Sequence, residues 1–159
     1  MLKEVEGCLQ VLEGLRGEIK KTMEGLPRKA LDWQPIQGEG DLATNSMTAM
    51  VMHLVGSETF WFVQVIGGRD IKRDRDAEFK ARGVGLAELQ ARIDKAGRDA
   101  EEVLAGLKAE QMEEIREFRD RRVTVRWAIL HVLEHYATHL GHMQLTRQLW
   151  MARGGKARP

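Results

Sequence analysis

The sequence has little of what stabilises or targets an exported protein. It contains one cysteine, Cys8, which excludes an intramolecular disulfide and is typical of a reducing compartment. The first residues carry acids at Glu4, Glu6 and Glu13, where a signal peptide is uninterrupted and apolar. No stretch approaches the roughly 20 apolar residues that span a bilayer. We therefore expect a cytoplasmic protein that does not enter a membrane.

An excess of charge of either sign is also lacking. Lysine and arginine total 25 against 24 aspartates and glutamates, so no net field favours nucleic acid or an anionic membrane as a partner. The 159 residues suit a single domain with its own core, which we expect over residues 1–153. Residues 154–159, GGKARP, are expected to form a flexible basic tail.

What the sequence does have is helical periodicity. Apolar residues recur at intervals of three and four along most of the chain, and Pro27 and Gly67–Gly68 interrupt the pattern. Asn45 and Ser46 are suitable N-caps for the second and most apolar of the helices. We predict four helices, at about residues 2–24, 47–66, 86–106 and 124–152.

The connections between these helices are long and irregular in sequence. Residues 69–84 are strongly charged, which indicates a solvated connection, and residues 108–123 are compatible with a short extra helix or a loop. The sequence contains no convincing run of strands. The predicted fold is therefore all-α, a four-helix bundle with long inter-helix connections, in which sites form from side chains on facing helices.

Most of the histidines lie in the last predicted helix, in the stretch HVLEHYATHLGH. At about 100° per residue, His131, His135, His139 and His142 share one face, and apolar residues border it. The remaining histidine, His53, lies in the middle of the apolar second helix. We therefore expect the imidazoles of both helices to face the interior of the bundle.

Buried neutral imidazoles need partners, and a divalent metal satisfies several nitrogen lone pairs at once. One histidine on an apolar face is more often a hydrogen-bonded core residue, but a pair at i and i+4 with a third from another helix makes a metal site with an open position. Spacing allows two such pairs, His131 with His135 or His135 with His139. The HExxH motif of zincins and the Glu-x-x-His motifs of di-iron bundles are absent, whereas haem binding through two histidines remains an alternative.

Two motifs resemble the DinB-like superfamily, metal-binding four-helix bundles that include the YfiT-type proteins and thiol-dependent transferases. NSMTAMVMHLVGSETFWF is similar to the pattern N-S-x(6)-H-L-x-x-x-E-x-x-W, and TVRWAILHVLEHYATHLGHMQLTRQL is similar to W-x-x-x-H-x-x-x-[HE]-x-x-x-H-x-G-[QH]. The resemblance implies that His53, His135 and His139 bind a divalent metal ion, either zinc, nickel, iron or manganese. Where many relatives carry Arg and Gln, this chain has Leu140 and His142.

The expected function is that of a metal-dependent enzyme acting on a small molecule. A zinc-like ion lowers the pKa of bound water toward about 7 and favours thiolate over thiol, so either can become the nucleophile. The resemblance implies a thiol-dependent S-transferase or isomerase, or a hydrolase, with a low-molecular-weight thiol as cofactor because nothing brings Cys8 to the site. The alternative is a non-catalytic metal-binding or stress-associated bundle. A homodimer is compatible with either function.

The motifs do not identify a catalytic side chain. Glu58 is a candidate general base, although it lies about 140° around the helix from His53. His131 and His142 are candidates for proton transfer or for hydrogen bonds to the metal ligands. Residues nearer the His53 face are expected to line the pocket, with space left by Gly56: Ser46, Ser57, Phe60 and Gln64.

Overall fold

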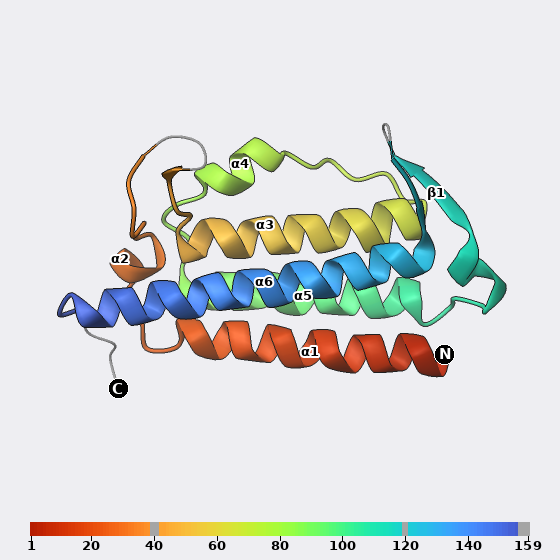
Figure 1. The fold of residues 1–159 in the computed structure, drawn as a ribbon, viewed down its shortest axis with the longest axis horizontal. Coiled ribbons are helices and arrows are strands. Elements are labelled where there is room, and N and C mark those ends of the chain that lie inside the picture. Colours follow the sequence, from red (N-terminus) through yellow and green to blue (C-terminus); the bar gives the residue numbers. More distant parts are fainter. Residues whose placement is uncertain (39–41, 119–120, 156–159) are drawn as a thin grey trace.

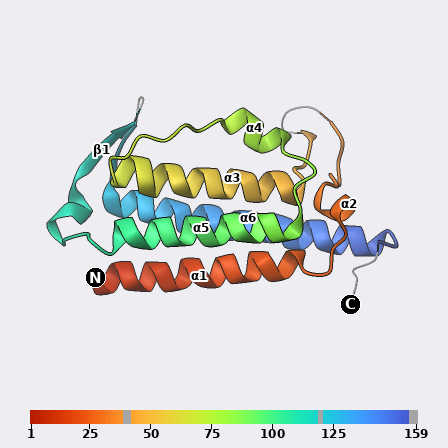
Figure 2. The ribbon, with the colours of Figure 1, turned by 180° about the vertical axis from the view of Figure 1, so that it is seen from behind.

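The computed structural model describes residues 1–38, 42–118 and 121–155, and these are mostly helical, as predicted. Within this part of the chain, four long helices run side by side (Figures 1 and 2). Two of them, α1 and α3, each pack against both α5 and α6, so the core lies between the four. Their bounds are α1 Lys3–Met23, α3 Met47–Thr59, α5 Leu86–Leu104 and α6 Val125–Ala152.

The ends of the long helices follow local sequence signals. Ser46 and Thr124 each accept a hydrogen bond from a backbone N–H in the first turn of the helix that follows, α3 and α6 respectively. The first helix ends before Gly25, which takes a left-handed conformation with φ of 70°. The chain continues from α3 directly into a π-helical segment, η2 (Phe60–Ile66), and Gly68 follows with φ of 68°.

The connections contain more regular structure than the sequence predicts, although a short helical turn within residues 108–123 is one of its alternatives. Two short helices, α2 (Arg28–Leu31) and α4 (Arg75–Lys80), interrupt segments expected to be irregular. A 3-10 turn, η3 (Glu110–Glu113), precedes an antiparallel hairpin of β1 (Ile115–Phe118) and β2 (Arg121–Thr124). The expectation of a chain without strands is therefore wrong. Each strand has only four residues, too few for an alternating pattern to stand out.

The hairpin closes one end of the helical assembly (Figure 1). Its register pairs Ile115 with Thr124 and Phe118 with Arg121. The ring of Phe118 lies 4.4 Å from that of Phe60 in η2, measured between centroids, in an edge-to-face arrangement. This contact brings residues from the second half of the chain beside the C-terminal end of the second long helix.

The segment Met47–Ile66 has the length and composition of a membrane span, with a mean hydropathy of 1.3. The expectation that no stretch of the chain is long and apolar enough is therefore wrong. In the structure, 67% of this apolar window is buried inside the fold. An all-round apolar helix is also what the core of a folded domain requires, so one such segment is weak evidence for a membrane protein.

A buried polar cluster joins three of the long helices. Glu58 of α3 is fully buried, and its carboxylate accepts hydrogen bonds from Arg16 of α1 and, at 2.5 Å, from the hydroxyl of Tyr136 of α6. Gly97 of α5 lies against the same guanidinium, where an added Cβ would come within 3.2 Å of an Arg16 nitrogen. The cluster therefore ties α3 to both α1 and α6, and the glycine lets α5 pack over it.

We expect Arg16→Met to lower the free energy of unfolding by about 3–5 kcal/mol, because it leaves the buried Glu58 carboxylate without its cation. Tyr136→Phe removes one hydrogen bond to the same carboxylate and should cost about 1.5–3 kcal/mol. The double variant Arg16→Met/Glu58→Gln removes both charges and should recover much of the loss. Urea unfolding followed by circular dichroism measures all three. A double variant as unstable as Arg16→Met alone would show that an unpaired charge is not the cause.

Candidate metal centre

Three histidines converge between α3 and α6. The Nε2 atom of His135 lies 3.1 Å from Nε2 of His53 and 3.1 Å from Nε2 of His139. All three candidate ligand atoms lie within 4.8 Å of one another. His135 and His139 project from the same face of α6 one turn apart, and His53 meets them from α3. Of the two pairs that spacing allows, this is the one that the structure brings together with His53.

The hydrogen-bonding capacity of this three-histidine cluster fits a cation. The Nδ1 atom of His53 lies 3.0 Å from a carboxylate oxygen of Glu78, so Nδ1 carries the proton and Nε2 presents a lone pair. A proton on Nε2 of His135 can be donated well to only one of the two neighbouring nitrogens, and without that proton the Nε2 lone pairs of His135 and His53 face each other. The Nδ1 atoms of His135 and His139 are buried without a partner among the described residues. A divalent cation that accepts all three Nε2 lone pairs removes this conflict.

The imidazoles of His135 and His139 are neutral at physiological pH. Burial, reinforced by the neighbouring histidines, lowers the pKa of His135 to about 3 and that of His139 to about 4. Neutral imidazole is the form that coordinates a metal, so protons compete weakly for these nitrogens near pH 7. These two nitrogens are therefore ready to bind a cation without first losing a proton.

Glu78 of α4 orients His53. Its carboxylate also accepts hydrogen bonds from Nε of Arg73 at 2.7 Å and from a terminal nitrogen of the same guanidinium at 2.9 Å. Burial alone would raise the pKa of Glu78, but the hydrogen bonds from Arg73 and His53 outweigh it and lower the pKa. A histidine whose second nitrogen donates to a carboxylate is a recurrent arrangement around protein metal ions, because it fixes the ring and its tautomer.

Gly56 makes the contact between Glu78 and α3 possible. A Cβ added at this glycine would lie 2.0 Å from Oε1 of Glu78. The space expected at Gly56 is therefore filled by a carboxylate of the chain itself. Glu78 and Arg73 both belong to residues 69–84, and the interpretation of that segment as a solvated connection is wrong for them. No spacing or periodicity marks either residue in the sequence, because their partner on α3 is far away in the chain.

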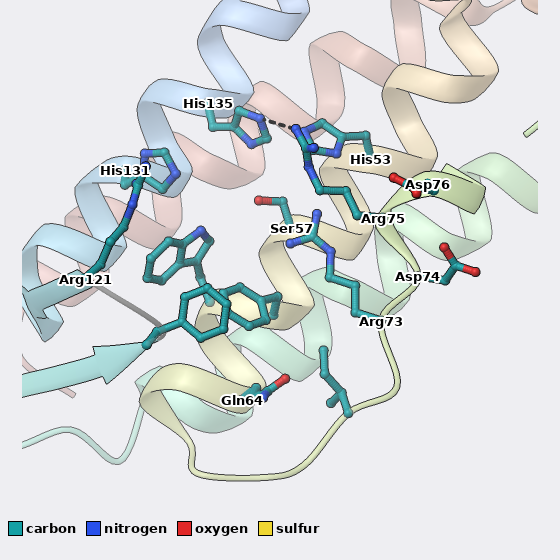
Figure 3. A pocket seen from close by; sticks show the side chains of 14 residues that line it. His53, Ser57, Gln64, Arg73, Asp74, Arg75, Asp76, Arg121, His131 and His135 are labelled. Carbon is teal, nitrogen blue, oxygen red and sulfur yellow. Dashed lines mark hydrogen bonds between the residues drawn. The ribbon is translucent and has the colours of Figure 1, made fainter. Parts of the chain in front are cut away.

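A cleft of about 960 Å³ lies beside the cluster, with His53 and His135 in its wall (Figure 3). Residues that precede and follow the end of α3 line the cleft as expected: Ser57, Phe60 and Gln64. Ser46, also expected there, is instead the N-cap of α3. The cleft therefore extends from the cluster toward η2 and the hairpin.

The cleft has aromatic and cationic walls. Three aromatic rings packed edge to face form one part of it: Phe60, Trp61 and Phe118. Arg73, Arg75 and Arg121 also line the cleft, together with Asp74 and Asp76. Figure 3 shows the side chains of Arg73 and Arg75 directed inward, whereas Asp74 and Asp76 lie on the outer side. The interior of the cleft thus offers more positive than negative charge.

The remaining candidate residues lie outside the cluster. His131 lines the cleft and stacks on His135 with ring centroids 5.8 Å apart, and burial lowers its pKa. His142 is exposed, so the expectation that it faces the interior of the bundle is wrong, and its ring lies 5.6 Å from that of His139. Glu58 is fully buried, and both of its carboxylate oxygens are bound within the core. The role of general base considered for Glu58 does not fit this position.

Comparisons with known proteins agree with the fold. The structure superposes on one described as "Crystal structure of the conserved protein of locus from Enterococcus faecalis", with a TM-score of 0.74, 12% identity, and coverage of 96% of this chain and 99% of that one. At this identity the likeness concerns the fold alone. No curated protein matches the chain. A family model described as mycothiol-S-transferase matches residues 8–152. The chain therefore belongs to the mycothiol S-transferase family, a DinB/YfiT-like family.

Proposed function

We propose that the protein is a metal-dependent S-transferase in which His53, His135 and His139 hold a divalent cation. The observation that carries the proposal is the convergence of three Nε2 atoms within 4.8 Å of one another beside a large cleft. Membership of a family named for mycothiol S-transfer supports a small thiol as co-substrate, with mycothiol the first to test. The four long helices then act as a DinB-type four-helix bundle whose facing helices supply the ligands.

A divalent cation at this position would favour a thiolate over a thiol at neutral pH. The residues of the chain contribute by holding the three lone pairs together and by lining the approach with polar and cationic groups. Arg73 is engaged by Glu78, whereas Arg75 and Arg121 have no carboxylate partner among the described residues. Cations directed into the cleft further favour the anionic form of a bound thiol.

The thiol comes from solution in this proposal. Cys8 is the chain's only thiol, and it lies on α1, away from the residues that line the cleft. Burial raises the pKa of Cys8, which makes it a weak nucleophile at neutral pH. Hydrolysis would call for a general base beside the cluster, and the carboxylate considered for it, Glu58, is bound by Arg16 and Tyr136 instead. The family name describes S-transfer, and this reaction is therefore favoured over hydrolysis.

We expect His135→Ala to abolish stoichiometric binding of Zn²⁺, because it removes the nitrogen that lies closest to both other ligands. His131→Ala is the matched control, since it changes the same residue type one turn earlier and removes the alternative histidine pair. Elemental analysis and competition with a chromogenic chelator measure the metal. Turnover of mycothiol with 1-chloro-2,4-dinitrobenzene should depend on the same ion. A His135→Ala protein that loses the metal and keeps its turnover would refute this mechanism, and metal binding without turnover would favour the non-catalytic alternative.

We expect Glu78→Gln to weaken Zn²⁺ binding by about 10–100-fold, because His53 loses the carboxylate that fixes its tautomer. Gly56→Ala should have a similar effect, since its Cβ displaces the same carboxylate. Gly141→Ala is the control: it lies on α6 near the cluster, and its Cβ meets nothing within 4 Å. Chelator competition gives the affinities, and circular dichroism checks folding. Unchanged affinity in both Glu78→Gln and Gly56→Ala would show that Glu78 does not position the ligand.

A further inference from the structure

A second cavity, of about 280 Å³, adjoins the three-histidine cluster. Its lining includes His139 and then follows α6 toward the C-terminus, whereas the lining of the cleft includes His135 and follows α6 toward the N-terminus. Met50 of α3 also lines this cavity, one turn before His53, and Pro35 contributes from the connection that precedes α3. The cluster therefore lies between two spaces that open along the same pair of helices.

The two spaces differ in chemistry. The cleft is lined by five charged side chains besides its histidines, three of them arginines. The described lining of the second cavity contains no Lys, Arg, Asp or Glu. It is formed largely by apolar groups, namely Pro35, Met50, Leu145 and Leu149, with Thr44 and Asn45 among its polar members. The cleft also has an aromatic wall, but an uncharged ligand with an apolar body would have to displace water from its charged groups, and the second cavity imposes no such cost.

We propose that this cavity binds the electrophilic co-substrate of the S-transferase, a small apolar compound with a carbon–halogen bond, while the cleft binds the polar thiol. The inference rests on the function proposed above. The volume is just below the roughly 300 Å³ at which pockets for drug-sized ligands begin, so it suits one substituted ring. His139 belongs to the cavity and its Nε2 lies 3.1 Å from that of His135, which belongs to the cleft. The proposal places the reacting atoms of both ligands at this cluster, because it borders both spaces.

The reaction is a substitution at carbon without any change in redox state. The thiol releases its proton to solvent, and the thiolate sulfur donates an electron pair to the carbon that bears the halogen. The carbon–sulfur bond forms and the carbon–halogen bond breaks, in that order when the carbon belongs to a nitro-substituted aromatic ring, and the halide leaves with the bonding pair. Binding both reactants at one place lowers the activation free energy substantially, because their encounter then costs no further translational entropy.

Occupancy of the cavity can be measured without turnover. In Zn²⁺-loaded protein labelled with ¹³C-methyl methionine, the unreactive probe 1,3-dinitrobenzene should shift the signal of Met50, which is 3% exposed and faces the cavity. Met112, 2% exposed and in the lining of neither space, is the internal control. Met50→Leu assigns the signal. The proposal is overturned if the probe shifts the signals of Met112 and Met50 equally, or if it shifts neither signal.

The kinetic test compares two matched variants of α6. Leu145 is 53% exposed and lines the cavity, and Leu130 is 51% exposed and lines neither space. Leu145→Asp should raise KM for 1-chloro-2,4-dinitrobenzene by about tenfold or more and leave KM for mycothiol unchanged, because a charge enters an apolar site. Leu130→Asp should change neither constant. An effect of Leu145→Asp on the KM for the thiol alone, or equal effects of both variants, overturns the assignment.

Two further results separate this inference from its alternatives. If the wild-type protein turns over no pair of thiol and electrophile, the S-transferase function fails, and the Met50 signal alone then decides whether the cavity takes an apolar ring. Sedimentation of the same variants tests whether a second copy of the chain, and not a small ligand, covers this apolar surface. A dimer that Leu145→Asp dissociates and Leu130→Asp does not would assign this surface to a second copy of the chain and overturn the proposal.

Discussion

The arrangement of the site depends on one hydrogen bond between α3 and α6, from the hydroxyl of Tyr136 to the carboxylate of Glu58. Tyr136 directly follows His135, and Glu58 lies little more than one turn after His53. Sliding α6 by one residue moves it about 1.5 Å along its axis and rotates its face, which would break this bond and separate the imidazoles together. Because the carboxylate is fully buried, the alternative registers leave one of its oxygens, and the buried hydroxyl of Tyr136, without a hydrogen bond in the core. Apolar packing alone discriminates less sharply between neighbouring registers.

Three imidazole ligands carry no negative charge. A divalent cation held by them therefore keeps most of its positive charge. Glu78 contributes a negative charge to His53 only, and Arg73 compensates it. Arg75 and Arg121 add further positive charge in the neighbouring cleft. Such a centre stabilises an anionic nucleophile more than one with carboxylate ligands, because no ligand charge cancels the field at the open position. The choice of histidines, and the indirect placement of the one carboxylate, therefore suit chemistry on a thiolate.

The parts of the fold and site that could be predicted are those with a long repeating signal. The long helices repeat their apolar positions over many turns, and helical geometry alone puts His135 and His139 on one face. Spacing could not choose between two histidine pairs, because the choice depends on the axial position of His53 on another helix. Glu78 and Gly56 act through a contact between segments with no common pattern. The hairpin cannot be predicted in this way, because strands of four residues are too short to show an alternating pattern. Glu58 is close to His53 in the sequence, which makes it a candidate for the site. Its angle around the helix, however, directs it into the core.

One face of α6 explains why the two spaces differ. From the N-terminal end, positions three or four apart carry His131, His135, His139 and His142 and then continue with Leu145 and Leu149. The first two of these histidines line the cleft, whereas His139 and His142 line the second cavity together with the two leucines that follow them. A transferase that joins a polar thiol to an apolar carbon compound needs both environments within bonding distance of one another. A single helix supplies them without any movement of the backbone, because the ligands His135 and His139 lie at the boundary between the two spaces and the leucines follow within three turns.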